Sequence, residues 1–161
     1  MIKIGIVGAI GSGKSFIAKK FGYPVFDADY EVNKLYNTNY TCFKKLNKTL
    51  PKYIISFPVK KKQITKAIIQ NKFNLKKIIK IIHPLIKKKM NLFIIKNKKK
   101  KIIILDIPLF LENKINKRKD VIVYVQSNKN EIIKKLKKRE NFNIKLFRIF
   151  QSIQLPVEYK K

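Results

Sequence analysis

The sequence predicts an α/β fold in which helices cover a parallel β-sheet, giving three layers. Short apolar runs rich in Ile and Val, typical of buried parallel strands, lie at residues 2–7, 25–26, 102–105 and 121–125. Helical patterning follows the first, second and fourth of these runs, and such crossovers favour parallel pairing of the strands. The expected order is therefore β-α-β, a long helical stretch, β-β and two final helices.

Each helix is predicted from the spacing of its apolar residues. The first covers residues 15–21 and the second covers residues 31–36. Within the long helical stretch, apolar residues between 75 and 86 recur at the i, i+3, i+4 and i+7 positions of one helix face. Pro84 should kink this helix or divide it in two, because proline lacks the N–H group that continues the hydrogen-bond ladder. The last two helices are expected at about residues 129–139 and 144–154.

A chain of 161 residues is long enough for one domain with a single core. We assign the core to about residues 1–36 and 102–128, and a helical insertion to about residues 37–101. A basic segment at about 129–143 is interpreted as a lid. The chain contains one cysteine, Cys42, which predicts neither a disulfide framework nor a thiolate metal cluster and favours a reduced, cytoplasmic compartment. No apolar run approaches the roughly 18 residues of a membrane span, and the oligomeric state stays open.

The net charge of +30, from 39 basic and 9 acidic residues, taken alone indicates a nucleic-acid or anionic membrane surface. The basic residues are mostly lysines spread along the whole chain, whereas arginine occurs only three times. A nucleic-acid surface uses arginine more often, because its planar fork matches phosphates and base edges. We therefore interpret the charge as drift toward A- and T-rich codons and expect no specific nucleic-acid partner.

Residues 8–15 read G-A-I-G-S-G-K-S and fit the phosphate-loop pattern G-x-x-x-x-G-K-[ST], with a strand before and a helix after. In such loops, which define the P-loop NTPase fold, backbone N–H groups turn onto the phosphates of ATP. Lys14 should reach the β- and γ-phosphates, and the Ser15 hydroxyl should bind Mg²⁺. The predicted ATP-binding residues of the loop and helix start are Gly11, Ser12, Gly13, Lys14, Ser15 and Phe16.

Acidic side chains follow two of the predicted strands. Asp27, Asp29 and Glu31 come after the second strand, where a carboxylate could accept the proton of an attacking hydroxyl or help to hold Mg²⁺. We favour this role for Asp29, although Asp27 or Asp29 could instead cap the following helix. Asp106 ends the third strand and is either an outer-shell Mg²⁺ carboxylate or part of a plain strand-end turn.

Two missing sequence motifs argue against a GTPase. Residues 128–131 read N-K-N-E and lack the final Asp of the guanine-reading motif N-K-x-D, and no D-x-x-G switch follows Asp106. Two other functions stay open beside a small-molecule kinase. A nucleoside monophosphate kinase usually has several arginines around its phosphate sites, whereas this chain has three in total. A nucleic-acid-binding P-loop ATPase would use the basic charge.

Several short motifs in this order resemble the dephospho-CoA kinase family along nearly the whole chain. The most specific are D-A-D at 27–29, H-P at 83–84 and P-L-F-L-E at 108–112, all after the phosphate loop. The resemblance implies that ATP phosphorylates the ribose 3′-hydroxyl of dephospho-CoA, and that the helical insertion binds the CoA moiety. It also implies that Asp29 is the catalytic base and that Arg139, in the lid, contacts the ATP phosphates.

The same resemblance assigns substrate contacts to Asp27, His83 and Glu112. For His83 a structural role at the helix kink, and for Glu112 a capping role, stay open. The chain also departs from the family, because Phe16 replaces a usual threonine and Lys135 stands at a lid position that is often arginine. The family continues with a further strand and helix beyond Lys161. We therefore expect a shortened carboxyl end and an open sheet edge at residues 121–125 or at a neighbouring strand.

Overall fold

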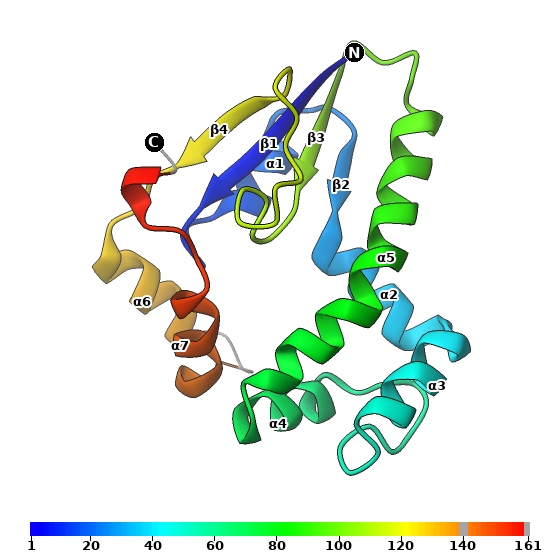
Figure 1. The fold of residues 1–161 in the computed structure, drawn as a ribbon. Coiled ribbons are helices and arrows are strands. Elements are labelled where there is room, and N and C mark those ends of the chain that lie inside the picture. Colours follow the sequence, from blue (N-terminus) through cyan, green and yellow to red (C-terminus); the bar gives the residue numbers. More distant parts are fainter. Residues whose placement is uncertain (139–141, 160–161) are drawn as a thin grey trace. The chain divides into compact units, whose positions relative to one another are not determined.

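The chain is described by a computed structural model that covers residues 1–138 and 142–159 (Figure 1). It divides into two compact units, which we call the sheet unit, Met1–Ala28 with Phe93–Lys161, and the helical unit, Asp29–Leu92. The elements, in chain order, are β1 (Ile2–Gly8), α1 (Lys14–Lys20), β2 (Val25–Asp27), α2 (Ala28–Thr38), α3 (Tyr40–Thr49), α4 (Lys61–Gln70), α5 (Phe73–Lys96), β3 (Ile102–Asp106), β4 (Val121–Val125), α6 (Lys129–Lys137), α7 (Ile144–Ser152) and a 3₁₀ turn (Val157–Tyr159).

The four predicted strands form one parallel sheet in the order β2-β3-β1-β4, which confirms the predicted fold class. β1 pairs with β3 on one side and with β4 on the other, so its carboxyl end lies between two neighbours. In open α/β sheets, ligands bind beyond the carboxyl ends of the strands at such a position. β4 lies at one edge of the sheet, as the sequence predicted, and Val121 at its start is 45% exposed.

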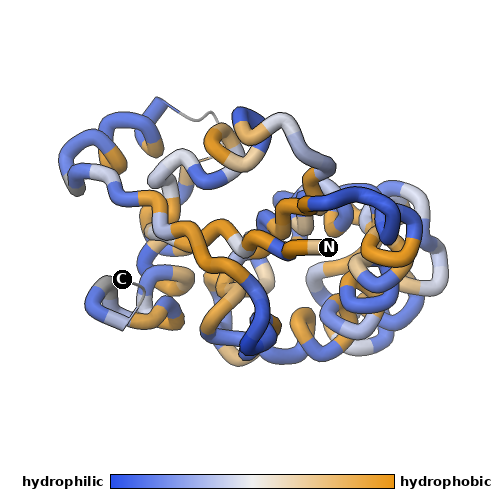
Figure 2. Tube along the Cα trace, turned by 90° about the horizontal axis from the view of Figure 1, so that it is seen from above, coloured by the Kyte–Doolittle hydropathy of each residue, from blue (hydrophilic) through white to orange (hydrophobic). Residues whose placement is uncertain are grey.

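Both faces of the sheet are covered, because side chains along a strand alternate between its two faces. On one face, Ile6 and Ile104 pack against Ala18 of α1, and all three are fully buried. On the other face, the Phe110 ring packs over Gly5, which has no side chain to obstruct it. In Figure 2 the strands are mainly hydrophobic, whereas the helices alternate between hydrophobic and hydrophilic residues.

The helical unit has its own core, built from the apolar faces of α2 to α5. Asn39 begins α3 with its side-chain oxygen accepting the N–H of Cys42, a usual way to satisfy the first turn of a helix. Asn74 is 5% exposed, and its side-chain amide donates a hydrogen bond to the carbonyl of Ala67. This bond joins α5 to α4 and offsets the free-energy cost of burying the polar side chain. The buried apolar residues include Leu35, Tyr36, Cys42, Leu46, Leu50, Ile54, Val59, Ala67, Ile68, Leu75, Ile78, Ile82 and Ile86.

Of the two effects predicted for Pro84, the division of the long helix is wrong, because α5 continues through this residue to Lys96, whereas the kink stays a prediction. Proline removes one N–H donor, but it leaves the hydrogen bonds of the other turns in place. The buried residues of α5 recur on one face before and after Pro84, and their packing keeps the helix intact. Among the described residues, no helix is long and apolar enough to cross a membrane.

Candidate active site

The phosphate loop follows β1 and leads into the first turn of α1, as its sequence pattern predicted. Gly11 and Gly13 have φ angles of 83° and 92°, in the left-handed region that other residues rarely adopt. The Lys14 Nζ donates to the backbone oxygens of Gly8, at 3.1 Å, and Ala9, at 2.7 Å. These bonds hold the ammonium group over the loop, where a phosphate would meet it.

Ser12 lies in the middle of the loop and is 4% exposed. Its hydroxyl oxygen is buried and makes no hydrogen bond within the described part of the chain. Its backbone oxygen accepts a hydrogen bond of 2.9 Å from the hydroxyl of Ser127, which follows β4. The loop therefore combines a rigid backbone with a buried polar atom, as expected of a cradle for a polar ligand.

The helix α6 packs directly on the phosphate loop. Ile132 and Leu136 of this helix are 8% and 3% exposed. A Cβ placed on Gly11 would lie only 3.0 Å from Leu136 Cγ and 3.2 Å from Ile132 Cγ2. The start of the segment interpreted as a lid is thus in contact with the loop. The predicted phosphate ligand Arg139 lies outside the described residues.

Asp106, at the end of β3, is 5% exposed and forms a side-chain hydrogen bond with Ser15 of the phosphate loop. Asp27, at the end of β2, is its partner in the register of the two strands. Burial raises the pKa of Asp106, and the nearby charge of Asp27 raises it further. The Ser15 hydrogen bond and the positive charges of Lys14 and Lys19 lower the same pKa in part.

The Ser15–Asp106 pair fits the chemistry of a Mg²⁺ site. Mg²⁺ prefers oxygen ligands, keeps several waters and is commonly held by one or two carboxylates together with substrate phosphates. A serine hydroxyl and a buried carboxylate beside a phosphate loop supply such ligands. Among the described residues, no group of three or more His, Cys, Asp or Glu side chains could hold a metal ion.

The other acidic residues occupy distinct positions near the start of α2. Asp27 directly precedes this helix, and Asp29 lies exposed in its first turn. A carboxylate in a first turn also interacts favourably with the helix dipole, so the capping interpretation is still open. Glu31 lies farther along the same helix and forms an ion pair of 2.7 Å with Lys89 of α5, which gives it a structural role inside the helical unit.

His83 and Phe16 are both exposed. His83 lies on α5 within the helical unit. Phe16 follows the phosphate loop, is 65% exposed and has the Lys20 Nζ 5.5 Å from its ring centroid. Their predicted roles, in substrate and ATP binding, stay predictions.

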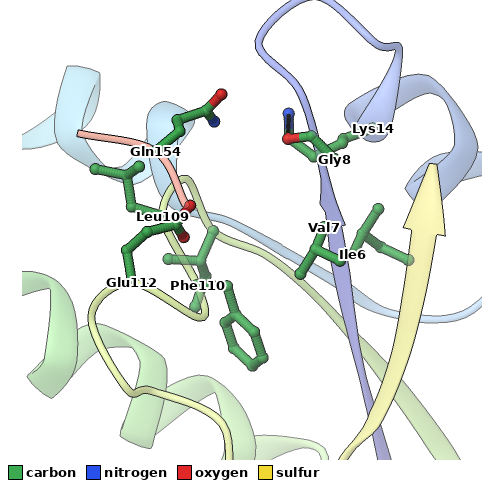
Figure 3. A pocket seen from close by; sticks show the side chains of 9 residues that line it. Ile6, Val7, Gly8, Lys14, Leu109, Phe110, Glu112 and Gln154 are labelled. Atoms are coloured by element: carbon green, nitrogen blue, oxygen red, sulfur yellow. Dashed lines mark hydrogen bonds between the residues drawn. The ribbon is translucent and has the colours of Figure 1, made fainter. Parts of the chain in front are cut away.

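A pocket opens beside Lys14 in the sheet unit (Figure 3), and the empty space within it, open solvent included, is about 200 Å³. Glu112, a predicted substrate residue, lies on its wall, and its Oε1 accepts a hydrogen bond of 2.9 Å from the N–H of Leu155. Sequence reasoning missed Gln154, which also lines the pocket and belongs to no motif that we recognised. The lining residues are Ile6, Val7, Gly8, Lys14, Ile107, Leu109, Phe110, Glu112 and Gln154.

Comparison with known proteins agrees with this geometry. A family model described as dephospho-CoA kinase matches residues 2–161. The chain is similar to the dephospho-CoA kinases of Wolbachia sp. subsp. Brugia malayi, at 32% identity, and of Bartonella quintana, at 33%, and each match covers 98% of this chain and 83% of the relative. The crystal structure of TT1252 from Thermus thermophilus shares the fold, with a TM-score of 0.74 and 24% identity over 99% of this chain and 83% of that one.

Proposed function

The chain belongs to the dephospho-CoA kinase family, and we propose that its phosphate loop, Asp106 and Asp29 carry out the reaction of that family. In this reaction ATP phosphorylates the ribose 3′-hydroxyl of dephospho-CoA, giving coenzyme A and ADP. The observation that best supports these roles is the hydrogen bond between Ser15 and the buried Asp106, which joins the phosphate loop to the end of β3.

The phosphate loop binds ATP through its backbone N–H groups and the positive end of α1. Gly11, Ser12 and Gly13 supply the curved backbone, and only glycine adopts the φ angles at the first and third positions without strain. Lys14 exchanges its bonds to the loop oxygens for the β- and γ-phosphates. Its charge then stabilises the negative charge that builds up on the transferring phosphoryl group.

Ser15 and Asp106 would hold Mg²⁺ together with the ATP phosphates, through the serine hydroxyl and the buried carboxylate. When bound, the ion would neutralise negative charge on the phosphates. Burial raises the pKa of Asp106, and a neighbouring cation would favour the ionised form that this role needs.

Asp29 accepts the proton of the attacking hydroxyl. The bond from phosphorus to the ADP oxygen breaks, a bond from phosphorus to the ribose 3′-oxygen forms, and the hydroxyl proton passes to the carboxylate. Asp29 follows β2 after a single alanine, and β2 pairs with β3 in register at Asp27 and Asp106.

The helical unit is the natural binding part for the rest of dephospho-CoA, since it is inserted between β2 and β3. Its exposed lysines would attract the negatively charged substrate. The segment after α6, with Arg139, would close over the ATP phosphates and limit wasteful hydrolysis. A cytoplasmic location agrees with a buried, free Cys42 thiol.

The test compares ADP release with and without dephospho-CoA in a coupled assay. Asp29→Asn should lower kcat by about 10²–10⁴-fold, the usual contribution of a general base, with little change in ATP affinity. Glu31→Gln is the matched control, because it changes a carboxylate of the same helix that is paired with Lys89. If Asp29→Asn and Glu31→Gln have the same small effect on kcat, Asp29 is a helix-start residue and not the base.

A further inference from the structure

We propose that Gln154 binds the acceptor sugar, and that Glu112 acts as a positioning residue that holds Gln154 in place. The inference rests on the proposed function, because it concerns the substrate of the same site. Gln154 lines the pocket that also contains Lys14 and Glu112. Figure 3 shows Gln154 and Lys14 on opposite sides of this pocket, with Glu112 and Leu109 next to Gln154.

The position of Gln154 depends on a hydrogen bond made by the next residue. The backbone N–H of Leu155 donates to Glu112 Oε1 at 2.9 Å. This bond joins the segment after α7 to the loop after β3, which are distant in the sequence. Because the N–H of Leu155 belongs to the peptide that begins at Gln154, fixing it also restricts where the Gln154 side chain can point.

The pocket is open to solvent, so its wall can contact one group of a larger substrate while the rest of that substrate stays outside. The two sides of its wall differ, with apolar contacts from Leu109 and Phe110 and polar groups from Glu112, Gln154 and Lys14.

The charges in the wall favour a hydroxyl-bearing group over a phosphate. The negative charge of Glu112 in the wall would repel a second phosphate but not a neutral sugar. The Gln154 amide can both donate and accept, which suits a ribose with neighbouring hydroxyl and ether oxygens. Lys14 marks the side of the pocket where the γ-phosphate lies, so a sugar held here places its hydroxyl close to the transferred group.

The experiment measures KM for both substrates and the affinity for dephospho-CoA by calorimetry. Gln154→Ala should raise KM for dephospho-CoA by about three- to tenfold, the effect of one neutral hydrogen bond, and leave KM for ATP within about twofold. Gln151→Ala is the matched control, because it truncates an exposed glutamine of α7 three residues earlier. Equal KM values in the two variants, or a rise confined to ATP, would overturn the proposal.

The positioning role of Glu112 is tested separately. Glu112→Gln keeps an oxygen that can accept the Leu155 N–H and should stay close to the parent, whereas Glu112→Ala should reproduce the KM of Gln154→Ala. The double variant Glu112→Ala/Gln154→Ala should be no worse than Gln154→Ala alone. If the KM increases of the two single variants multiply in the double variant, Glu112 contacts the sugar directly, and the positioning role is overturned. Thermal melts identify any variant that is merely unfolded.

Failure of the proposed function gives a different result. If the parent chain binds dephospho-CoA but releases no ADP in its presence, the reaction is wrong while the calorimetric comparison of Gln154→Ala with Gln151→Ala still decides the inference. If the parent chain neither binds nor phosphorylates dephospho-CoA, both the proposed function and the sugar site are overturned.

Discussion

Replacing Gly5 by alanine tests how closely the loop after β3 is held against the sheet. A Cβ on Gly5 would lie 2.9 Å from both Cδ1 and Cζ of Phe110, and closer still to Cε1. Carbon atoms in contact are normally about 3.5–4.0 Å apart, so the ring would have to move by roughly 1 Å. Phe110 is 1% exposed, so its ring has little room to move. We expect this overpacking to cost about 1–3 kcal/mol of the free energy of unfolding.

Such a cost corresponds to a fall in Tm of about 2–12 °C, at about 2–4 °C per kcal/mol for a chain of this size. Activity should fall as well, because Phe110 and its neighbour Leu109 line the pocket beside Lys14. The assay is a thermal melt followed by circular dichroism, combined with the kinetics of dephospho-CoA phosphorylation.

Phe110→Leu supplies the second side of a double-mutant cycle, because it removes ring atoms that the new methyl group would strike. Gly5→Ala should cost clearly less in the Phe110→Leu background than in the parent. An equal penalty in both backgrounds, or an unchanged Tm in the single variant, would refute the packing argument.

Three further substitutions test the phosphate loop and its surroundings. Lys14→Ala should lower kcat by about 10²–10³-fold, as for loss of one transition-state donor, in a chain shown to be folded by circular dichroism. Burial raises the pKa of Asp106 above the value of about 3.9 in the unfolded chain. Between these two pKa values the folded state binds a proton that the unfolded chain has lost, so the free energy of unfolding falls as the pH rises through this window. Asp106→Asn should therefore raise Tm at neutral pH and flatten this dependence, while activity is lost. Gly11→Ala should raise KM for ATP, because its φ of 83° is strained for alanine and its Cβ would press on Leu136 and Ile132; an unchanged KM would contradict the observed packing.

The parts of the site that are local in the sequence were predictable from the sequence. The phosphate loop is contiguous, and its glycines, lysine and serine must stand at fixed spacings for the backbone to curve around a phosphate. The strands were also predictable, since four short apolar runs with β-branched residues are typical of strands buried in a parallel sheet. Asp106 was identified from the sequence as a carboxylate at the end of a strand. The sequence did not decide whether it helps to hold Mg²⁺ or only forms part of a turn.

Contacts between distant segments were decided only by the tertiary structure. The strand order β2-β3-β1-β4 brings Asp106 to the Ser15 hydroxyl and pairs Asp27 with Asp106. Gln154 belongs to no motif that we recognised, and it lines the pocket next to a hydrogen bond from the Leu155 N–H to Glu112, two residues that are far apart in the sequence. A motif can be recognised from the sequence because its residues are neighbours along the chain, so their relative positions depend mainly on the local backbone. Which distant side chains meet depends on how the sheet and its covering segments pack, and the packing free energy is shared among many residues with no local signature.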